Sequence, residues 1–280
     1  AMGNYPFDKL DSYNDMLDSH LGISVVPTVF IKNEIFKYNT EKQLDVLADN
    51  IVFLINKRCD EKFKKSTVAN EIQIDCDWTK STKDHYFYLL KKIKEISKKE
   101  ISCTLRLYPY KYSEIMGVPP VDKVMLMCYN LVRPLTKSDK NSILDIAELK
   151  SYLDRKRSYP VHMDVALPIF SWSQLYQNNH FQKLVDISSV DLKEFTKEVK
   201  PMWYEVTKDT TLNWNDYYRL ADQIKCEEVS AATLNEAIVV IKKNVSLDAT
   251  TTISLFDLDE SIFKKYSNEE ITGFYDTFTK

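Results

Sequence analysis

The stretch Glu71–Thr79, with the sequence EIQIDCDWT, is the part of the chain on which the interpretation of the fold depends. Apolar and polar residues alternate along it, which predicts a β-strand, and Asp75 and Asp77 at its C-terminal end share one face of that strand. In a (β/α) barrel the C-terminal strand ends form the mouth where active sites lie, so both carboxylates would point there. Asp77 or Thr79 could instead cap a helix that begins near Ser81, but such a cap leaves Asp75, inside the strand, unexplained.

Strand-like and helix-like segments alternate along most of the chain, which favours a parallel sheet built from βα units. The expected strands are residues 24–31, 71–78, 101–108, 123–130, 162–169 and 252–258, and the expected helices include 40–57, 83–97, 146–157 and 231–243. Residues 170–203 are expected to form a loop with short helices, and residues 203–228 a hairpin.

We therefore expect one TIM-type (β/α) barrel-like domain over residues 1–280, with an inserted hairpin or loop region at approximately 171–229, before the last strand. A closed barrel needs eight strands. Six are visible, so either the sequence starts inside the domain or the barrel is incomplete at its N-terminus.

Composition excludes several classes of function. The 38 basic and 41 acidic residues nearly balance, so there is no electrostatic footprint for nucleic acid. Only four glycines are present, which argues against a glycine-rich phosphate-binding loop, and no cofactor is expected. The five cysteines lack CxxC spacing and the four histidines lack metal-ligand spacing, so no metal site is expected.

The sequence contains no apolar run of transmembrane length and no signal peptide. The opening residues Ala1, Met2 and Gly3 are typical of a cloning remnant. An export signal could therefore have been removed, and export to the periplasm or the cell surface is compatible with the chain. We expect a monomer.

Two short motifs carry a resemblance to a known family. Residues 74–79, IDCDWT, resemble the Asp-x-Asp-x-Glu strand of family-18 glycoside hydrolases, the chitinase group, and residues 127–130, MCYN, resemble that family's Met-x-Tyr-Asp strand end. One βα unit separates the two motifs, as in the family. More broadly, EIQIDCDWT, GVPPVDKVMLMCYN and DVALPIFSW together resemble an uncharacterised bacterial family of glycoside-hydrolase-type barrels, over most of the chain from Val26 onward.

The chain departs from the chitinase pattern at two positions. The family's glutamate, which protonates the glycosidic oxygen, is replaced here by Thr79, whose hydroxyl is too weak an acid for that step. The aspartate that ends the second motif is replaced by Asn130. The resemblance therefore implies the fold and a saccharide ligand, while other carboxylates would have to supply the chemistry.

The candidate site residues fall at predicted strand ends. A pair of carboxylates is the usual machinery of glycoside hydrolysis, and the candidates for that role are Asp75, Asp77, Asp164 and Asp259. Aromatic, amide and guanidinium side chains suit a hydroxyl-rich ligand, and the candidates for substrate binding are Trp78, Arg106, Tyr108, Tyr110, Tyr129, Asn130 and Trp172. Each has a structural alternative: aromatic residues can simply fill the barrel top, and Arg106 can neutralise Asp75 or Asp77 across adjacent strands.

Two functions follow from this pattern. The first is a glycoside-hydrolase-like protein that acts on or binds a glycan or oligosaccharide at the C-terminal mouth of the barrel. The alternative is a non-catalytic saccharide-binding or scaffold barrel that has lost the catalytic acid. Another class of hydrolase is less favoured, because the sequence contains no serine nucleophile elbow and no Cys/His arrangement.

Overall fold

A computed structural model describes residues 22–64, 67–135, 137–154, 157–212, 216–257 and 265–279. The chain divides into two compact units, each described by itself below. The first unit comprises Ala1–Leu126 with Tyr159–Asp164, and the second comprises Met127–Ser158 with Val165–Lys280. That residues 1–280 act as one domain stays a prediction.

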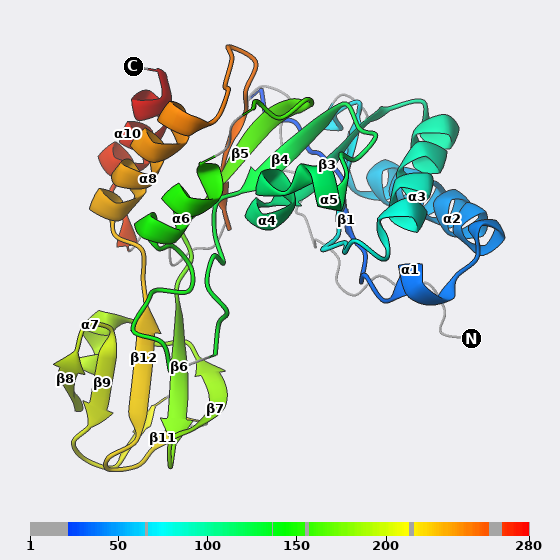
Figure 1. The fold of residues 1–280 in the computed structure, drawn as a ribbon. Coiled ribbons are helices and arrows are strands. Elements are labelled where there is room, and N and C mark those ends of the chain that lie inside the picture. Colours follow the sequence, from blue (N-terminus) through cyan, green and yellow to red (C-terminus); the bar gives the residue numbers. More distant parts are fainter. Residues whose placement is uncertain are drawn as a thin grey trace. The chain divides into compact units, whose positions relative to one another are not determined.

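A parallel sheet supplies the framework of the fold (Figure 1). Its strand order is β1-β2-β3-β4-β5-β13, and parallel registers join β1 to β2, β2 to β3 and β5 to β13. The strands are β1 (Thr28–Phe30), β2 (Glu71–Asp75), β3 (Glu100–Arg106), β4 (Lys123–Met127), β5 (His162–Pro168) and β13 (Ile253–Phe256). Each coincides with one of the six predicted strands, β3 beginning one residue before its predicted start. The prediction of an incomplete TIM-type barrel is confirmed.

Helices of the first unit follow the strands as βα units require. They are α1 (Ile35–Tyr38), α2 (Glu41–Lys62), α3 (Lys83–Ser97), α4 (Leu107–Lys111) and α5 (Ser113–Met116). Helix α2 buries Leu44, Ala48, Ile51, Val52 and Ile55, and α3 buries Tyr86, Leu89, Leu90 and Ile93. These three- and four-residue spacings form apolar stripes, and the two helices are in contact.

Strand alternation separates two chemically different faces of β2 and β3. Ile72 and Ile74 of β2 and Cys103 of β3 are fully buried, and Cys76, which follows β2, lies with Cys103 beside Tyr86 of α3. The apolar face therefore packs against the helical layer. The other face carries the polar residues.

The second unit contains the inserted region that was expected before the last strand. It forms a five-stranded antiparallel sheet in the order β7-β6-β12-β9-β8 and a two-stranded sheet, β10-β11 (Figure 1). The elements are β6 (Trp172–Gln177), β7 (His180–Val185), α7 (Ser189–Leu192), β8 (Thr196–Lys200), β9 (Trp203–Val206), β10 (Thr210–Leu212), β11 (Asp216–Tyr218) and β12 (Gln223–Glu227). One face of the larger sheet covers a core that includes Leu175, Phe195 and Ile224.

The expectation of a loop with short helices over residues 170–203 is wrong. Asn178 and Asn179 both have positive φ angles, 49° and 67°, and connect β6 to β7. Two-residue turns of this kind favour asparagine and match the twist of the strands they join. The Asn-Asn pair was therefore a hairpin signal in the sequence.

Three further helices of the second unit lie in the described part of the chain. They are α6 (Ile146–Leu153), α8 (Ala231–Asn244) and α10 (Asn268–Thr279). Helix α8 contacts both α6 and α10. No helix in the described part of the chain is long and apolar enough to cross a membrane.

Candidate functional site

The polar face of β2 and β3 forms a series of paired side chains that runs from the N-terminal to the C-terminal end of the strands. At the N-terminal end Ser102 donates a hydrogen bond to Glu71, at 2.5 Å. Further along, Thr104 Oγ1 donates to Asp75 Oδ1 at 2.6 Å. Residues two apart on a strand face the same way, so Asp77 continues this row beyond the end of β2.

Arg106 holds Asp77 at the C-terminal end of the row. Arg106 Nε donates to Asp77 Oδ1 at 2.7 Å, and its terminal nitrogen donates to Oδ2 at 3.2 Å. This two-bond geometry is the specific pairing of a guanidinium with a carboxylate. The Asp77 side chain is nevertheless 56% exposed, so it remains accessible to a ligand.

Asp75 is the more buried of the two carboxyls. Burial raises the pKa of Asp75 above its ordinary value, and the negative charge of Asp77 raises it further. The hydrogen bond from Thr104 and the positive charge of Arg106 act in the opposite direction. The site therefore holds one carboxyl whose burial raises its pKa, Asp75, beside the more exposed Asp77.

A cavity of about 350 Å³ lies at this end of the strands. Its walls include Asp77, Thr79, Arg106, Tyr108 and Met116. Its charged groups are Asp77, just past the end of β2, Arg106, the last residue of β3, and Lys80, in the turn before α3. The remaining walls come from the segments that follow the two strands.

Two aromatic residues differ from their predicted settings because β3 ends earlier than expected. The strand stops at Arg106, and Leu107–Lys111 forms α4. Tyr108 therefore lies on a helix, where it is half exposed and lines the cavity, while Tyr110 is buried and stacked on Tyr159. Pro109 explains the break, because proline donates no hydrogen bond to a sheet and is tolerated in the first turn of a helix.

Trp78 also differs from the prediction of a sugar-stacking residue. It lines the cavity but is only 4% exposed, its indole Nε1 donates to the Met116 carbonyl at 3.1 Å, and its ring stacks on Tyr86 at 5.3 Å. Its neighbour Thr79 shares hydrogen bonds with Ser81 and Thr82 in the turn before α3. Trp78 therefore belongs to the core beneath the site.

Asp164 lies at the opposite end of the strands from Asp77. It is the third residue of β5, buried, 3.3 Å from His162 Nε2 and 3.7 Å from Lys123 Nζ. Lys123 also pairs with Glu71 at 2.7 Å. The N-terminal strand ends of such barrels serve stability, so the prediction of Asp164 as a catalytic partner of Asp77 is wrong.

The second unit has its own group of rings at strand C-termini, the aromatic group, formed by Tyr129, Phe170, Trp172 and Phe256. Tyr129 stacks on Phe256 with ring centroids 5.1 Å apart and planes 3° apart, and Phe170 meets Tyr129, Phe256 and Trp172 edge-on. Phe256 is 45% exposed. Sequence reasoning had found Tyr129 and Trp172 but missed Phe170 and Phe256, although both fall at the ends of predicted strands.

A buried carboxylate orients Trp172. Glu227 is fully buried and accepts hydrogen bonds from Trp172 Nε1 at 2.6 Å and Gln174 Nε2 at 2.6 Å, and it pairs with Lys225 at 2.7 Å. It also accepts from both the backbone and the hydroxyl of Ser142. The hydrogen bond to Glu227 therefore holds the indole of Trp172 in one orientation, and part of the ring remains exposed to solvent.

Asn130 follows Tyr129 and has a left-handed backbone, with φ 55°. Its Oδ1 atom is buried without a hydrogen-bond donor among the described residues. Asp259 lies outside the described residues. Within those residues, no group of three or more His, Cys, Asp or Glu side chains is arranged to hold a metal.

Comparison with known proteins identifies the fold. No family model and no curated protein matches the chain. A crystal structure of a chitinase from Chromobacterium violaceum matches with a TM-score of 0.58 and 10% identity, over 100% of this chain and 87% of that one. The spore cortex-lytic enzyme of Bacillus cereus matches with a TM-score of 0.52 and 12% identity, over 90% of this chain and 60% of that one. At such identities the likeness shows the fold alone: the chain has the fold of these two enzymes.

The raised pKa of Asp75 predicts a pH-dependent stability. Because its folded pKa exceeds its unfolded one, the stability present at low pH is lost as the pH rises through the folded pKa. Asp75→Asn removes this titration. We expect wild type to lose unfolding free energy relative to Asp75→Asn between about pH 3 and about pH 7, measured by urea denaturation.

Asp122→Asn is the matched control. The pKa of Asp122 is lowered, because donation from Lys94 and from the Ile101 backbone outweighs burial, which raises it. Its stabilising contribution is therefore present at neutral pH and lost as the pH falls. The assignment would be contradicted if the unfolding free energy of wild type changed with pH in the same direction relative to both variants, or did not change with pH relative to Asp75→Asn.

Proposed function

We propose that this chain binds a glycan at the C-terminal end of its parallel strands and does not hydrolyse it by the chitinase route. The observation that carries the proposal is the pairing of Arg106 with both oxygens of Asp77 at an open cavity, next to a threonine where chitinases keep their acid.

The chemistry of the cavity suits a saccharide. An exposed carboxylate beside a guanidinium offers adjacent acceptors and donors, and sugar hydroxyls both donate and accept. Tyr108 stands half exposed at the cavity wall and presents a ring to the apolar face of a sugar. A few polar groups among apolar walls is the usual composition of a small-molecule site.

The same residues are poorly suited to protonate a leaving group. A general acid needs a proton to donate near neutral pH, and both oxygens of Asp77 already accept hydrogen bonds from Arg106. Thr79 is engaged with Ser81 and Thr82, and its hydroxyl is too weak an acid.

In the second unit, the aromatic group is a further candidate surface for the glycan. Phe256 and Trp172 each present part of a ring, and the bond from Glu227 fixes the indole of Trp172. Rigid aromatic surfaces contribute large contact area at little entropic cost. We infer that sugar rings stack there.

A hydrolase is the second candidate function, and one observation favours it. Asp75 is the carboxyl in this site whose pKa is raised, which is the condition for an acid that works nearer neutral pH. It is also hydrogen-bonded to Thr104 and less exposed than Asp77. The two functions separate in an activity assay.

We expect no hydrolysis of chromogenic N-acetylglucosamine oligomers by the wild type, since general acid catalysis contributes a factor of about 100 to 10,000. Thr79→Glu alone should not create activity, because Asn130 also departs from the chitinase pattern. If the wild type hydrolysed these oligomers at ordinary enzymatic rates and Asp75→Asn abolished that hydrolysis, the proposal of binding alone would be refuted and the hydrolase function supported.

Isothermal calorimetry against a panel of oligosaccharides tests binding. Tyr108→Ala and Arg106→Gln should each weaken binding of the preferred glycan about tenfold, which corresponds to the loss of about 1.4 kcal/mol. Tyr38→Ala is the control, because Tyr38 is 80% exposed on α1 and does not line the cavity. Equal affinities of all three variants and wild type would place the glycan elsewhere.

A further inference from the structure

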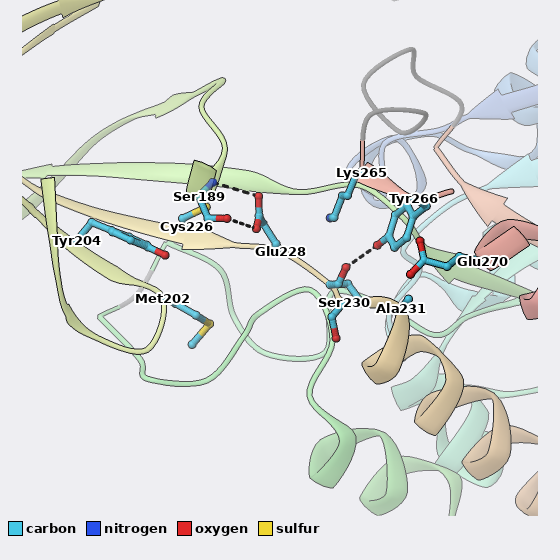
Figure 2. A pocket seen from close by; sticks show the side chains of 11 residues that line it. Ser189, Met202, Tyr204, Cys226, Glu228, Ser230, Ala231, Lys265, Tyr266 and Glu270 are labelled. Carbon is cyan, nitrogen blue, oxygen red and sulfur yellow. Dashed lines mark hydrogen bonds between the residues drawn. The ribbon is translucent and has the colours of Figure 1, made fainter. Parts of the chain in front are cut away.

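A second cavity, of about 440 Å³, lies within the second unit (Figure 2). Its polar walls come from the start of α7, the end of β12 and the segment around the start of α10, and its apolar walls include Met202 and Tyr204. The polar groups are Ser189, Glu228, Ser230, Lys265, Tyr266 and Glu270. None of them belongs to the candidate glycan site or to the aromatic group.

Lys265 is the unusual residue of this cavity. Its Nζ atom is buried and has no hydrogen-bond partner among the described residues. Burial lowers the pKa of Lys265, while the nearby Glu228 carboxylate and the Cys226 thiol oppose that shift. A buried donor without an acceptor is costly, so such groups are normally satisfied by protein, water, an ion or a ligand.

Glu228 contributes the opposite charge. Its carboxylate accepts hydrogen bonds from the Ser189 backbone at 3.2 Å and from the Ser189 hydroxyl at 2.7 Å, and Figure 2 shows these two bonds. Each bond uses one carboxylate oxygen, and a carboxylate has about four acceptor positions. Glu228 is thus held in place with acceptor capacity to spare.

The two charges do not meet. Among the described residues Lys265 Nζ has no hydrogen-bond partner, so it does not bond to Glu228, although the charge of Glu228 affects the pKa of Lys265. Figure 2 shows both side chains reaching into the same pocket from different segments. A bound group that accepts from Lys265 and donates to Glu228 would bridge them.

The start of a neighbouring helix favours an anionic group beside Lys265. Helix α8, of 14 residues, begins at this cavity, and Ala231 lies in its first turn, where backbone amides lack partners within the helix. Tyr266 donates its hydroxyl proton to the Val229 carbonyl at 2.5 Å. The Tyr266 hydroxyl proton is therefore committed, and Lys265 remains the strong donor that needs an acceptor.

We propose that this cavity binds a small zwitterion of the amino-acid type, with its carboxylate on Lys265, its ammonium on Glu228 and its side chain against Met202 and Tyr204. A neutral polyol would satisfy hydrogen bonds but neutralise neither charge. A simple anion would face Glu228 and Glu270 without compensation, and a simple cation would leave Lys265 unpaired. The proposal does not depend on the glycan function.

Calorimetry at neutral pH with L-alanine, L-leucine, L-glutamine and L-lysine tests the proposal. The amino acid that binds best is then compared with two analogues that share its side chain: the carboxylic acid without the amine and the amine without the carboxylate. We expect the zwitterion to bind at least about tenfold more tightly than either analogue, because each analogue loses one charged contact.

Two variants assign the contacts. Lys265→Met should weaken binding of the zwitterion about tenfold or more and abolish its advantage over the amine analogue. Glu228→Gln, which can still accept from Ser189, should abolish the advantage over the carboxylic acid analogue. Lys242→Met is the matched control, because Lys242 lies on α8 and donates to the Thr277 carbonyl away from the cavity walls; it should bind like wild type.

Thermal unfolding of each variant shows that the fold is retained. The proposal is overturned if none of the four amino acids binds, if the best binder is no tighter than its analogues, or if Lys265→Met binds it as wild type does. Should Lys265→Met not fold, an unchanged preference in Glu228→Gln overturns the proposal by itself.

Discussion

The candidate site depends on the pairing of polar side chains across β2 and β3, above all of Asp77 with Arg106. A polar residue on a buried sheet face is costly without a partner. Here each carboxylate along the row meets a donor from the neighbouring strand: Glu71 meets Ser102, Asp75 meets Thr104 and Asp77 meets Arg106. A slip of one residue would turn every one of these side chains to the helical layer, so the pairs and the register support one another.

Strand alternation made much of this predictable. The sequence EIQIDCDWT contains both the apolar face that packs on α3 and the acidic face that meets β3, and the ion pair between Arg106 and Asp77 was one of the two roles considered for Arg106. The six strands of the parallel sheet could also be predicted, because each is a short apolar run that lies between helical segments.

Other features were not predictable because they depend on tertiary contacts or on local breaks. The end of β3 is set by Pro109, which converts Tyr108 and Tyr110 from strand to helix positions. The burial of Trp78 depends on the Met116 carbonyl and on Tyr86, which lie further along the chain. Asp164 lies near the N-terminal end of β5 and not at the C-terminal end where Asp77 lies. Strand alternation predicts which face of the sheet a residue occupies, but not its position along the strand direction relative to residues of other strands.

The fold by itself does not decide the function. The chain shares its architecture with a chitinase and a spore cortex-lytic enzyme, yet the same scaffold can carry different chemistry at its strand ends. In this chain a threonine, Thr79, stands where the chitinase pattern keeps its acid, and the nearby Asp77 is salt-bridged to Arg106. This difference is the basis on which we propose glycan binding without hydrolysis by the chitinase route.

The most direct measurement is a crystal structure of the chain with the oligosaccharide that binds it most tightly. The account predicts an intact glycan with sugar hydroxyls in hydrogen-bond contact with Asp77 and Arg106 and a ring against Tyr108. A glycan seated away from these three residues, or one found cleaved in the site, would contradict it.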